Sequence, residues 1–150
     1  HPYIGDDNII TVGMLIIIAD IQQKQGLLNT AKQNVQKAIS LLERLFHNKP
    51  TRHKANCYRI LGDIYSNQDN HVQAREYYIK SESIYKDILK YLEIDDVSLI
   101  YERLAINSAK LNNFSQTKHY INFHKKHFGT NHPRTFSILN YLHENNFKIP

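Results

Sequence analysis

"YRILGDIYSNQDNHVQAREYYIKS", residues 58–81, decides the fold, because its apolar and small residues recur at helical spacing on both sides of a polar turn. The small residues Gly62 and Ala74 would let two antiparallel helices approach closely. Leu61, Tyr65 and Tyr78 would then fill the seam between the helices. The stretch therefore predicts a helix-turn-helix unit.

The pattern recurs 43 residues earlier and 43 residues later in the chain. Shifted back, Ala19 and Ala31 fall on the two small-residue positions, and shifted forward, Ala105 and Thr117 do. A fixed period of this length is typical of repeat proteins, in which similar units stack and bury a continuous core. The sequence therefore predicts three helix pairs that share one register.

The spacing within residues 58–81 resembles the tetratricopeptide repeat. The long period, and the joint "FGTNHPRT" (128–135) with "LNYL" (139–142) after it, are similar to the kinesin light chain subtype of that repeat. The resemblance covers most of the chain and is strongest in the second unit. It implies an all-α fold, a right-handed α-solenoid of antiparallel helix pairs with about three and a half repeats.

We expect one repeat domain over residues 1–150, and the matching joints at its two ends suggest a piece of a longer chain. The expected repeats are about 8–47, 52–92 and 95–128, with a partial or capping helix at 133–146. The expected helices are about 8–24, 27–47, 52–67, 70–92, 95–111, 114–128 and 133–146. Thr117 and His124 stand where small residues are usual, which indicates a third pair that is loosely packed or tilted.

The most apolar run is "TVGMLIIIAD", residues 11–20. It is shorter than the roughly 20 residues that span a bilayer, and Asp6 and Asp7 precede it where a signal peptide carries positive charge. In the 43-residue register it is the first helix of the first repeat. Because it is apolar on nearly all sides, we expect a stacking neighbour on its outer face, from a longer chain or from self-association through the end helices.

Composition excludes several classes of protein. The net charge of +5 is mild, and positively and negatively charged residues alternate along the chain. This pattern does not indicate nucleic-acid binding. Cys57 is the only cysteine, which rules out an internal disulfide and favours an intracellular, cytoplasmic setting. The chain has five glycines and no phosphate-binding loop or catalytic constellation, so we expect neither an enzyme nor a cofactor.

The basic segment 118–134 holds four histidines: His119, His124, His127 and His132. His124 and His127 are one turn apart, as metal ligands can be, but no carboxylate accompanies them, so we expect a packed histidine and no metal. Tyr120 and Phe123 lie among the lysines, as in a nucleic-acid surface, yet their spacing is that of helix packing.

Stacked repeats leave a concave face lined by the first helix of each pair, and binding is the usual role of that face. The residues that we expect to bind a peptide there are Asn56, Arg59, Asp63, Ser66, Glu102, Arg103, Ile106 and Asn140. Chaperone-binding family members use a Lys and an Asn of the first repeat to grip a C-terminal carboxylate, and the matching positions here are Ile16 and Asp20. That particular use is therefore not implied.

The predicted function is a protein-protein interaction module, an adaptor or scaffold that binds a peptide or protein segment in its concave groove. Two alternatives stay open: a peptide-sensing regulatory domain that controls an attached effector or DNA-binding domain, and a structural or self-association spacer.

Overall fold

The computed structural model describes residues 8–88 and 94–147. Over these residues the chain is all-α and contains no strand. Its helices are α1 (Ile9–Lys24), α2 (Leu28–Phe46), α3 (Arg52–Asn67), α4 (His71–Ile88), α5 (Ile94–Lys110), α6 (Phe114–Phe128) and α7 (Pro133–Glu144). Each bound lies within two residues of the sequence expectation, except that the expected end of α4 at residue 92 is outside the described residues.

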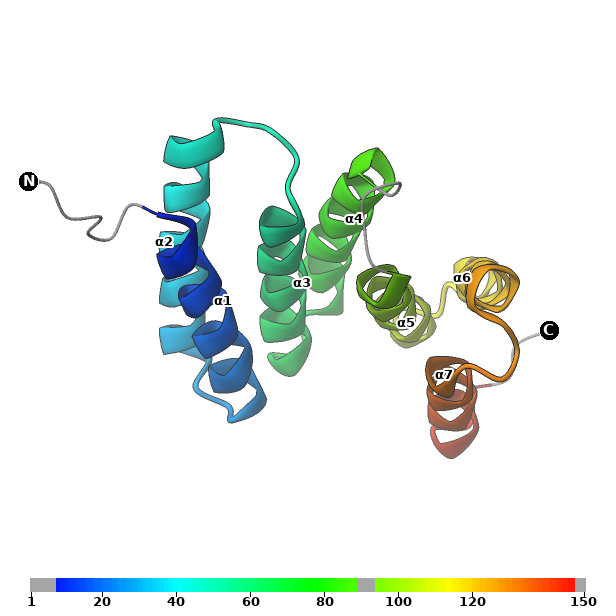
Figure 1. Cartoon of the computed structure of the whole chain (residues 1–150). Coiled ribbons are helices and arrows are strands. Elements are labelled where there is room, and N and C mark those ends of the chain that lie inside the picture. The colour runs from blue at the N-terminus through cyan, green and yellow to red at the C-terminus, as the bar shows by residue number, and fades with distance from the viewer. Residues whose placement is uncertain (1–7, 89–93, 148–150) are drawn as a thin grey trace, which may run out of the picture.

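Consecutive helices pack as pairs: α1 with α2, α3 with α4, and α5 with α6. In Figure 1 the pairs follow one another in chain order, and α1 to α4 alternate in direction. Helix α7 packs on α5 and α6. In the same view α5 and α6 are seen nearly end-on, while α1 to α4 run lengthwise up and down the picture, so the third pair is turned relative to the first two.

The first helix of each pair ends in the same turn. Gly26, Asp69 and Asn112 adopt positive φ angles of 81°, 57° and 59° at intervals of 43 residues. The following amide then bonds back five residues, as Asn113 N–H does to the Ser108 carbonyl at 2.8 Å. This is the Schellman closure, which needs a left-handed residue and accepts Asp or Asn where Gly is absent. The turn thus recurs with the predicted period.

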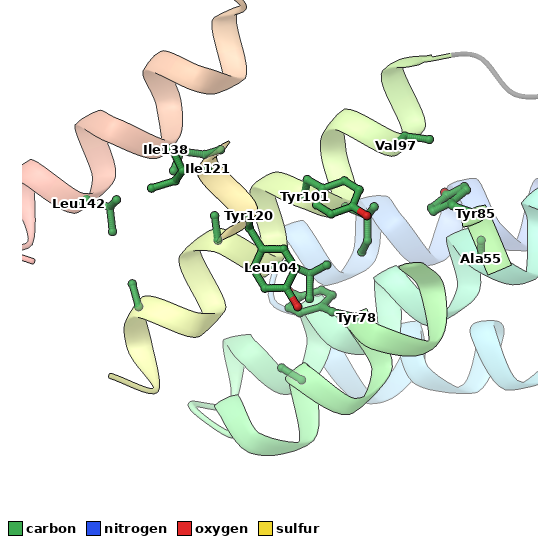
Figure 2. Close-up of a cluster of buried hydrophobic side chains, with 14 residues drawn as sticks. Ala55, Tyr78, Tyr85, Val97, Tyr101, Leu104, Tyr120, Ile121, Ile138 and Leu142 are labelled. Carbon is green, nitrogen blue, oxygen red and sulfur yellow. The ribbon is translucent and has the colours of Figure 1, made fainter. Parts of the chain in front are cut away.

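Close packing of α3 on α4 depends on Gly62, as the sequence predicted. A Cβ atom added to Gly62 would lie 2.5 Å from Cδ1 and 3.0 Å from Cζ of Tyr78, well inside normal contact. Tyr78 is buried and belongs to the larger of two apolar clusters, which extends from α3 to α7 (Figure 2). The smaller cluster joins α1, α2 and α3 and includes the buried Cys57.

Polar side chains occupy the seam of the third pair. His124 is fully buried, with Nε2 2.7 Å from Ser98 Oγ and Nδ1 2.9 Å from Thr135 Oγ1. Thr117 Oγ1 lies 2.8 Å from Ser108 Oγ. Burial of the imidazole lowers the pKa of His124 to about 4. His124 is therefore a packed histidine, as the sequence indicated, and it links α5, α6 and α7.

Helix α1 buries only its inner face, on which Val12, Ile16 and Ala19 pack. Its outer face is exposed among the described residues, so the burial on more than one side that its composition suggested does not occur within them. None of the helices in the described ranges is long and apolar enough to cross a membrane.

Candidate functional site

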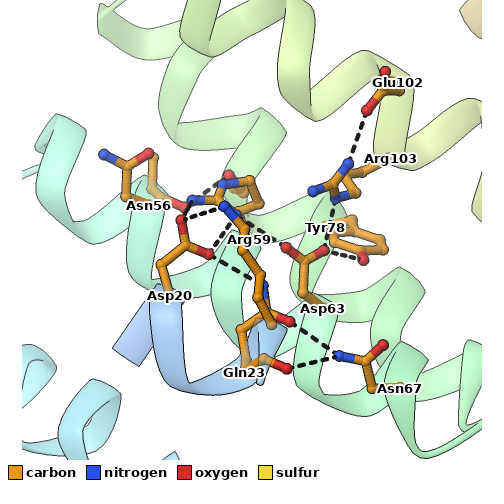
Figure 3. Close-up of polar contacts among 12 residues, drawn as sticks. Asp20, Gln23, Asn56, Arg59, Asp63, Asn67, Tyr78, Glu102 and Arg103 are labelled. Carbon is orange, nitrogen blue, oxygen red and sulfur yellow. Dashed lines mark hydrogen bonds and ion pairs between the residues drawn. The ribbon is translucent and has the colours of Figure 1, made fainter. Parts of the chain in front are cut away.

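Charged side chains on the inner helices form a continuous chain, which we call the ion chain: Asp20 of α1, Arg59 and Asp63 of α3, and Glu102 and Arg103 of α5 (Figure 3). Arg59 Nη2 lies 3.3 Å from Asp20 Oδ2, and Arg59 Nη1 lies 2.9 Å from Asp63 Oδ2. Arg103 Nε lies 2.8 Å from Asp63 Oδ1, and its Nη1 lies 2.8 Å from Glu102 Oε1. The ion chain therefore joins three helices that are distant in sequence.

Asp63 is the centre of the ion chain. The side chains of Asp63 and Arg59 are each only 7% exposed, and Tyr78 Oη donates a hydrogen bond to Asp63 Oδ1 at 2.5 Å. Burial alone would lower the pKa of Arg59 and of Arg103, but the neighbouring carboxylates outweigh it and raise both. Burial together with the Asp63 charge raises the pKa of Tyr78. The raised pKa values keep Arg59 and Arg103 charged and Tyr78 neutral.

The ion chain is neutral once Lys24 is included. Lys24 Nζ lies 3.6 Å from Asp20 Oδ2, so three acids face three cations. Burial would raise the pKa of Asp20, but the Arg59 charge and hydrogen bonds from Gln23 and Arg59 lower it. Because each buried charge already has a partner within the fold, the ion chain is first of all structural.

A cavity of about 380 Å³ opens beside the ion chain, at the C-terminal turns of α1, α3 and α5. It is lined by Gln23, Lys24, Asp63, Ser66, Asn67, Tyr78, Arg103, Ile106, Asn107, Lys110 and Tyr141. Four residues that the sequence predicted for the binding face are among them: Asp63, Ser66, Arg103 and Ile106. We call this space the groove cavity.

The other four predicted residues do not line the groove cavity. Arg59 is enclosed by Asp20 and Asp63, and Glu102 is buried against Arg103. Asn56 accepts a hydrogen bond from Tyr85 Oη at 2.7 Å. Asn140 is exposed on α7, beside Tyr141, which does line the cavity. Half of the predicted set thus lines the groove cavity, while Arg59 and Glu102 contribute to the ion chain beside it.

Lys110 lines the groove cavity with a positive charge that no acidic side chain pairs with among the described residues. No ion pair to it occurs within the described part of the chain, and its Nζ lies over the Tyr141 ring, 5.6 Å from the ring centre. Burial lowers the pKa of Lys110, and the Asp69 charge only partly opposes this effect. A half-buried ammonium group without an ionic partner is available to an incoming anion.

Three residues that line the groove cavity were not among the predicted binding residues, although the 43-residue period could have identified them. Lys24, Asn67 and Lys110 are 43 residues apart, so each occupies the same position in the last turn of the first helix of its pair. A polar or cationic residue recurring there marks a second line of contacts, one turn beyond Asp20, Asp63 and Ile106.

A second hollow, of about 360 Å³, lies between α6 and α7. Its lining combines apolar side chains such as Ile121 and Leu142 with the basic residues Lys118, Lys125 and His143. The lining includes residues of the basic segment 118–134, in which lysines alternate with aromatic residues as in a nucleic-acid-binding surface. Its residues Ile121 and Leu142 are buried in the larger apolar cluster, which agrees with a packing role for this part of α6.

No protein-family model matches the chain, and no curated protein matches its sequence. Within residues 8–88 and 94–147, no three His, Cys, Asp or Glu side chains gather closely enough to hold a metal ion.

Proposed function

We propose that this chain is a non-enzymatic protein-interaction module that binds an extended peptide carrying an acidic side chain in the groove cavity. In this proposal the helix pairs are tetratricopeptide-like repeats of a right-handed α-solenoid, and the groove cavity belongs to the concave face. The recurring turns at Gly26, Asp69 and Asn112 and the close approach at Gly62 support that arrangement.

The observation that carries the proposal is Lys110. Its ammonium group faces a cavity whose other charges are already paired, so one acidic group of a ligand would supply the missing counter-charge. Arg103, with 27% of its side chain exposed, lies in the same lining and adds a second cation near the ligand. Ser66 and the amides of Asn67 and Asn107 supply polar groups for a peptide backbone.

The peptide that fits this site has one acidic residue flanked by neutral residues. A strongly acidic peptide would be repelled by Asp63 and Glu102, which both pair with Arg103. A basic peptide would be repelled by Lys110, whose charge has no acidic partner among the described residues. An adaptor or scaffold within the cell is the role that such a site supports, and the unreactive Cys57 suits a reducing compartment. Burial raises the pKa of that thiol to about 12.

A peptide-display selection against the immobilised chain tests this proposal. We expect the enriched peptides to share one Asp or Glu, and Lys110→Glu to weaken their binding by on the order of 10-fold or more. The matched control is Lys37→Glu, which makes the same charge change at an exposed position of α2, away from the cavity. Absence of any enriched peptide, or equal binding to both variants, would refute the proposal.

Arg59→Glu is not a useful groove variant. Arg59 is enclosed between two carboxylates, so reversing its charge would disrupt the fold and abolish binding whether or not a ligand contacts the groove.

A further inference from the structure

Each helix pair meets the next helix of the chain at a junction: α2 with α3, α4 with α5, and α6 with α7. An aromatic side chain of α4, Tyr77, packs at the first junction, on the apolar cluster of α1, α2 and α3. Its ring stacks on that of Tyr65 in α3, with 5.5 Å between the ring centres. Lys32 Nζ of α2 in turn donates a hydrogen bond to Tyr65 Oη at 2.9 Å. Tyr77 therefore fills the first junction.

Tyr120 of α6 holds the equivalent position at the second junction. It follows Tyr77 by 43 residues, and each is the seventh residue of its helix. The Tyr120 ring lies 5.9 Å from that of Tyr101 in α5. Burial raises the pKa of Tyr120, and the charges of Glu82 and Arg75 in α4 act on it in opposite directions. The side chain thus lies close to both α4 and α5, and an aromatic residue fills this junction as well.

A cation recurs with the same period on the preceding second helix. Its three members are Lys32 of α2, Arg75 of α4 and Lys118 of α6. Lys32 lies beside the aromatic stack that includes Tyr77, and Arg75 lies close enough to Tyr120 to act on its pKa. Lys118 lines the hollow of about 360 Å³ at the third junction, which we call the α6–α7 hollow. Apart from α5, no helix within residues 8–88 and 94–147 packs on both α6 and α7.

The α6–α7 hollow combines buried apolar side chains with exposed positive charge. Ile121 and Leu142 in its lining are buried, and Leu139 beside them is 39% exposed. Lys118 and Lys125 lie seven residues apart on α6, which is about 10 Å along the helix axis. No acidic residue is in the lining, and neither lysine has an ion pair within the described part of the chain. A partner that fits must therefore carry both apolar and acidic groups.

We infer that the α6–α7 hollow is a docking site for an amphipathic helix of a partner polypeptide, which inserts an aromatic side chain beside Lys118 and turns acidic side chains toward Lys118 and Lys125. The two filled junctions indicate a helix, because a helix bearing an aromatic residue packs at each of them. The unpaired lysines indicate that the partner helix is acidic. No residue that lines the hollow also lines the groove cavity, so the inference does not depend on the proposed function.

Selection from a displayed library of amphipathic helices, each about 18 residues long so that the helix can form, tests this inference. We expect the enriched helices to share one aromatic residue with an Asp or Glu within two turns of it. Lys118→Glu should weaken the binding of an enriched helix by on the order of 10-fold or more, because it replaces attraction with repulsion. Leu139→Glu should weaken it by a similar factor, because it places a charge on the apolar surface.

Two matched controls make the same changes outside the hollow. Lys126→Glu reverses a charge on an exposed part of α6, and Val72→Glu replaces an apolar residue of α4 that is 64% exposed. Because neither residue lines the hollow, both variants should bind the helix within about 3-fold of the parent chain. Lys110→Glu, which alters the groove cavity, should bind it equally well. Circular dichroism establishes that all the variants are folded.

The inference would be overturned by the absence of any enriched helix, or by enriched helices that lack an aromatic residue. Equal losses in Lys118→Glu and Lys126→Glu would also overturn it, because they would indicate a general attraction of the basic surface, as for a nucleic acid. Binding that Lys110→Glu abolishes and Lys118→Glu leaves intact would place the helix in the groove cavity instead.

Discussion

Substituting Gly62 tests the closest contact in the fold. In Gly62→Ala the new methyl group would lie 2.5 Å from Cδ1 of Tyr78. The ring cannot move away freely, because Tyr78 is buried and its hydroxyl donates to Asp63, which Arg59 and Arg103 hold in place. Relief of the clash would therefore break that hydrogen bond or separate α3 from α4.

The expected cost follows from three contributions. Alanine favours a helix over glycine by about 1 kcal/mol. Overpacking costs about 1–3 kcal/mol, and loss of the hydrogen bond from Tyr78 to the charged Asp63 costs about 1.5–3 kcal/mol. We therefore expect Gly62→Ala to lower the free energy of unfolding by about 1.5–5 kcal/mol. Urea denaturation followed by circular dichroism measures this change.

A double-mutant cycle separates the clash from other effects. Tyr78→Ala removes the ring, and in that background Gly62→Ala should be neutral or should stabilise the chain by up to about 1 kcal/mol, because only the helix preference remains. If Gly62→Ala is neutral in the parent chain, or equally harmful in both backgrounds, the packing argument is wrong.

Three further predictions concern stability. Arg59→Met should lower the free energy of unfolding by about 3 kcal/mol, because it strands buried carboxylate charge; a urea-unfolding loss no larger than that of Lys37→Met would contradict this. Below the ordinary histidine pKa of 6.5 and down to about 4, only the unfolded chain protonates His124. This site should therefore weaken the chain by about 1.4 kcal/mol per pH unit as the pH falls through that window, and an unchanged pH slope in His124→Gln would exclude it. Asp69→Gly should raise the thermal midpoint, with a gain of about 0.5 kcal/mol, because glycine accepts the φ of 57° without strain; a lower midpoint would show that the Asp69 side chain is needed.

The helical content and the main packing contacts could be predicted from the sequence. Gly62 and Ala74 are small at the position where two helices meet, and the structure places Gly62 against the Tyr78 ring. The helix bounds could be predicted because apolar residues recur at helical spacing within each helix and polar turns interrupt that spacing between helices. These features depend on contacts within one helix pair. Such contacts follow from the helical spacing of residues that are close in the sequence.

The binding face was harder to predict, because it depends on distances between pairs. Helical period places Arg59 and Asp63 on one line, but it does not tell whether a neighbouring helix encloses them. Their spacing of four residues and their opposite charge were a usable sign of an internal pair. The contact of Arg103 with Asp63 spans 40 residues, and only the relative placement of α3 and α5 determines it.

The ion chain also affects the order in which the helices of this fold separate. Helical arrays in which each unit touches only its neighbours tend to open one unit at a time from the ends. Here separation of α1, α3 or α5 would strand a buried charge, so their amide hydrogens should exchange with deuterium together, as one cooperative block. Helix α7 carries no ion-chain residue, and its ionic link to α5 is the pair of Arg134 with Asp95, whose carboxylate is 70% exposed. Exchange in α7 should therefore precede that of the block, so the fold should open at α7 before α1, α3 and α5 separate.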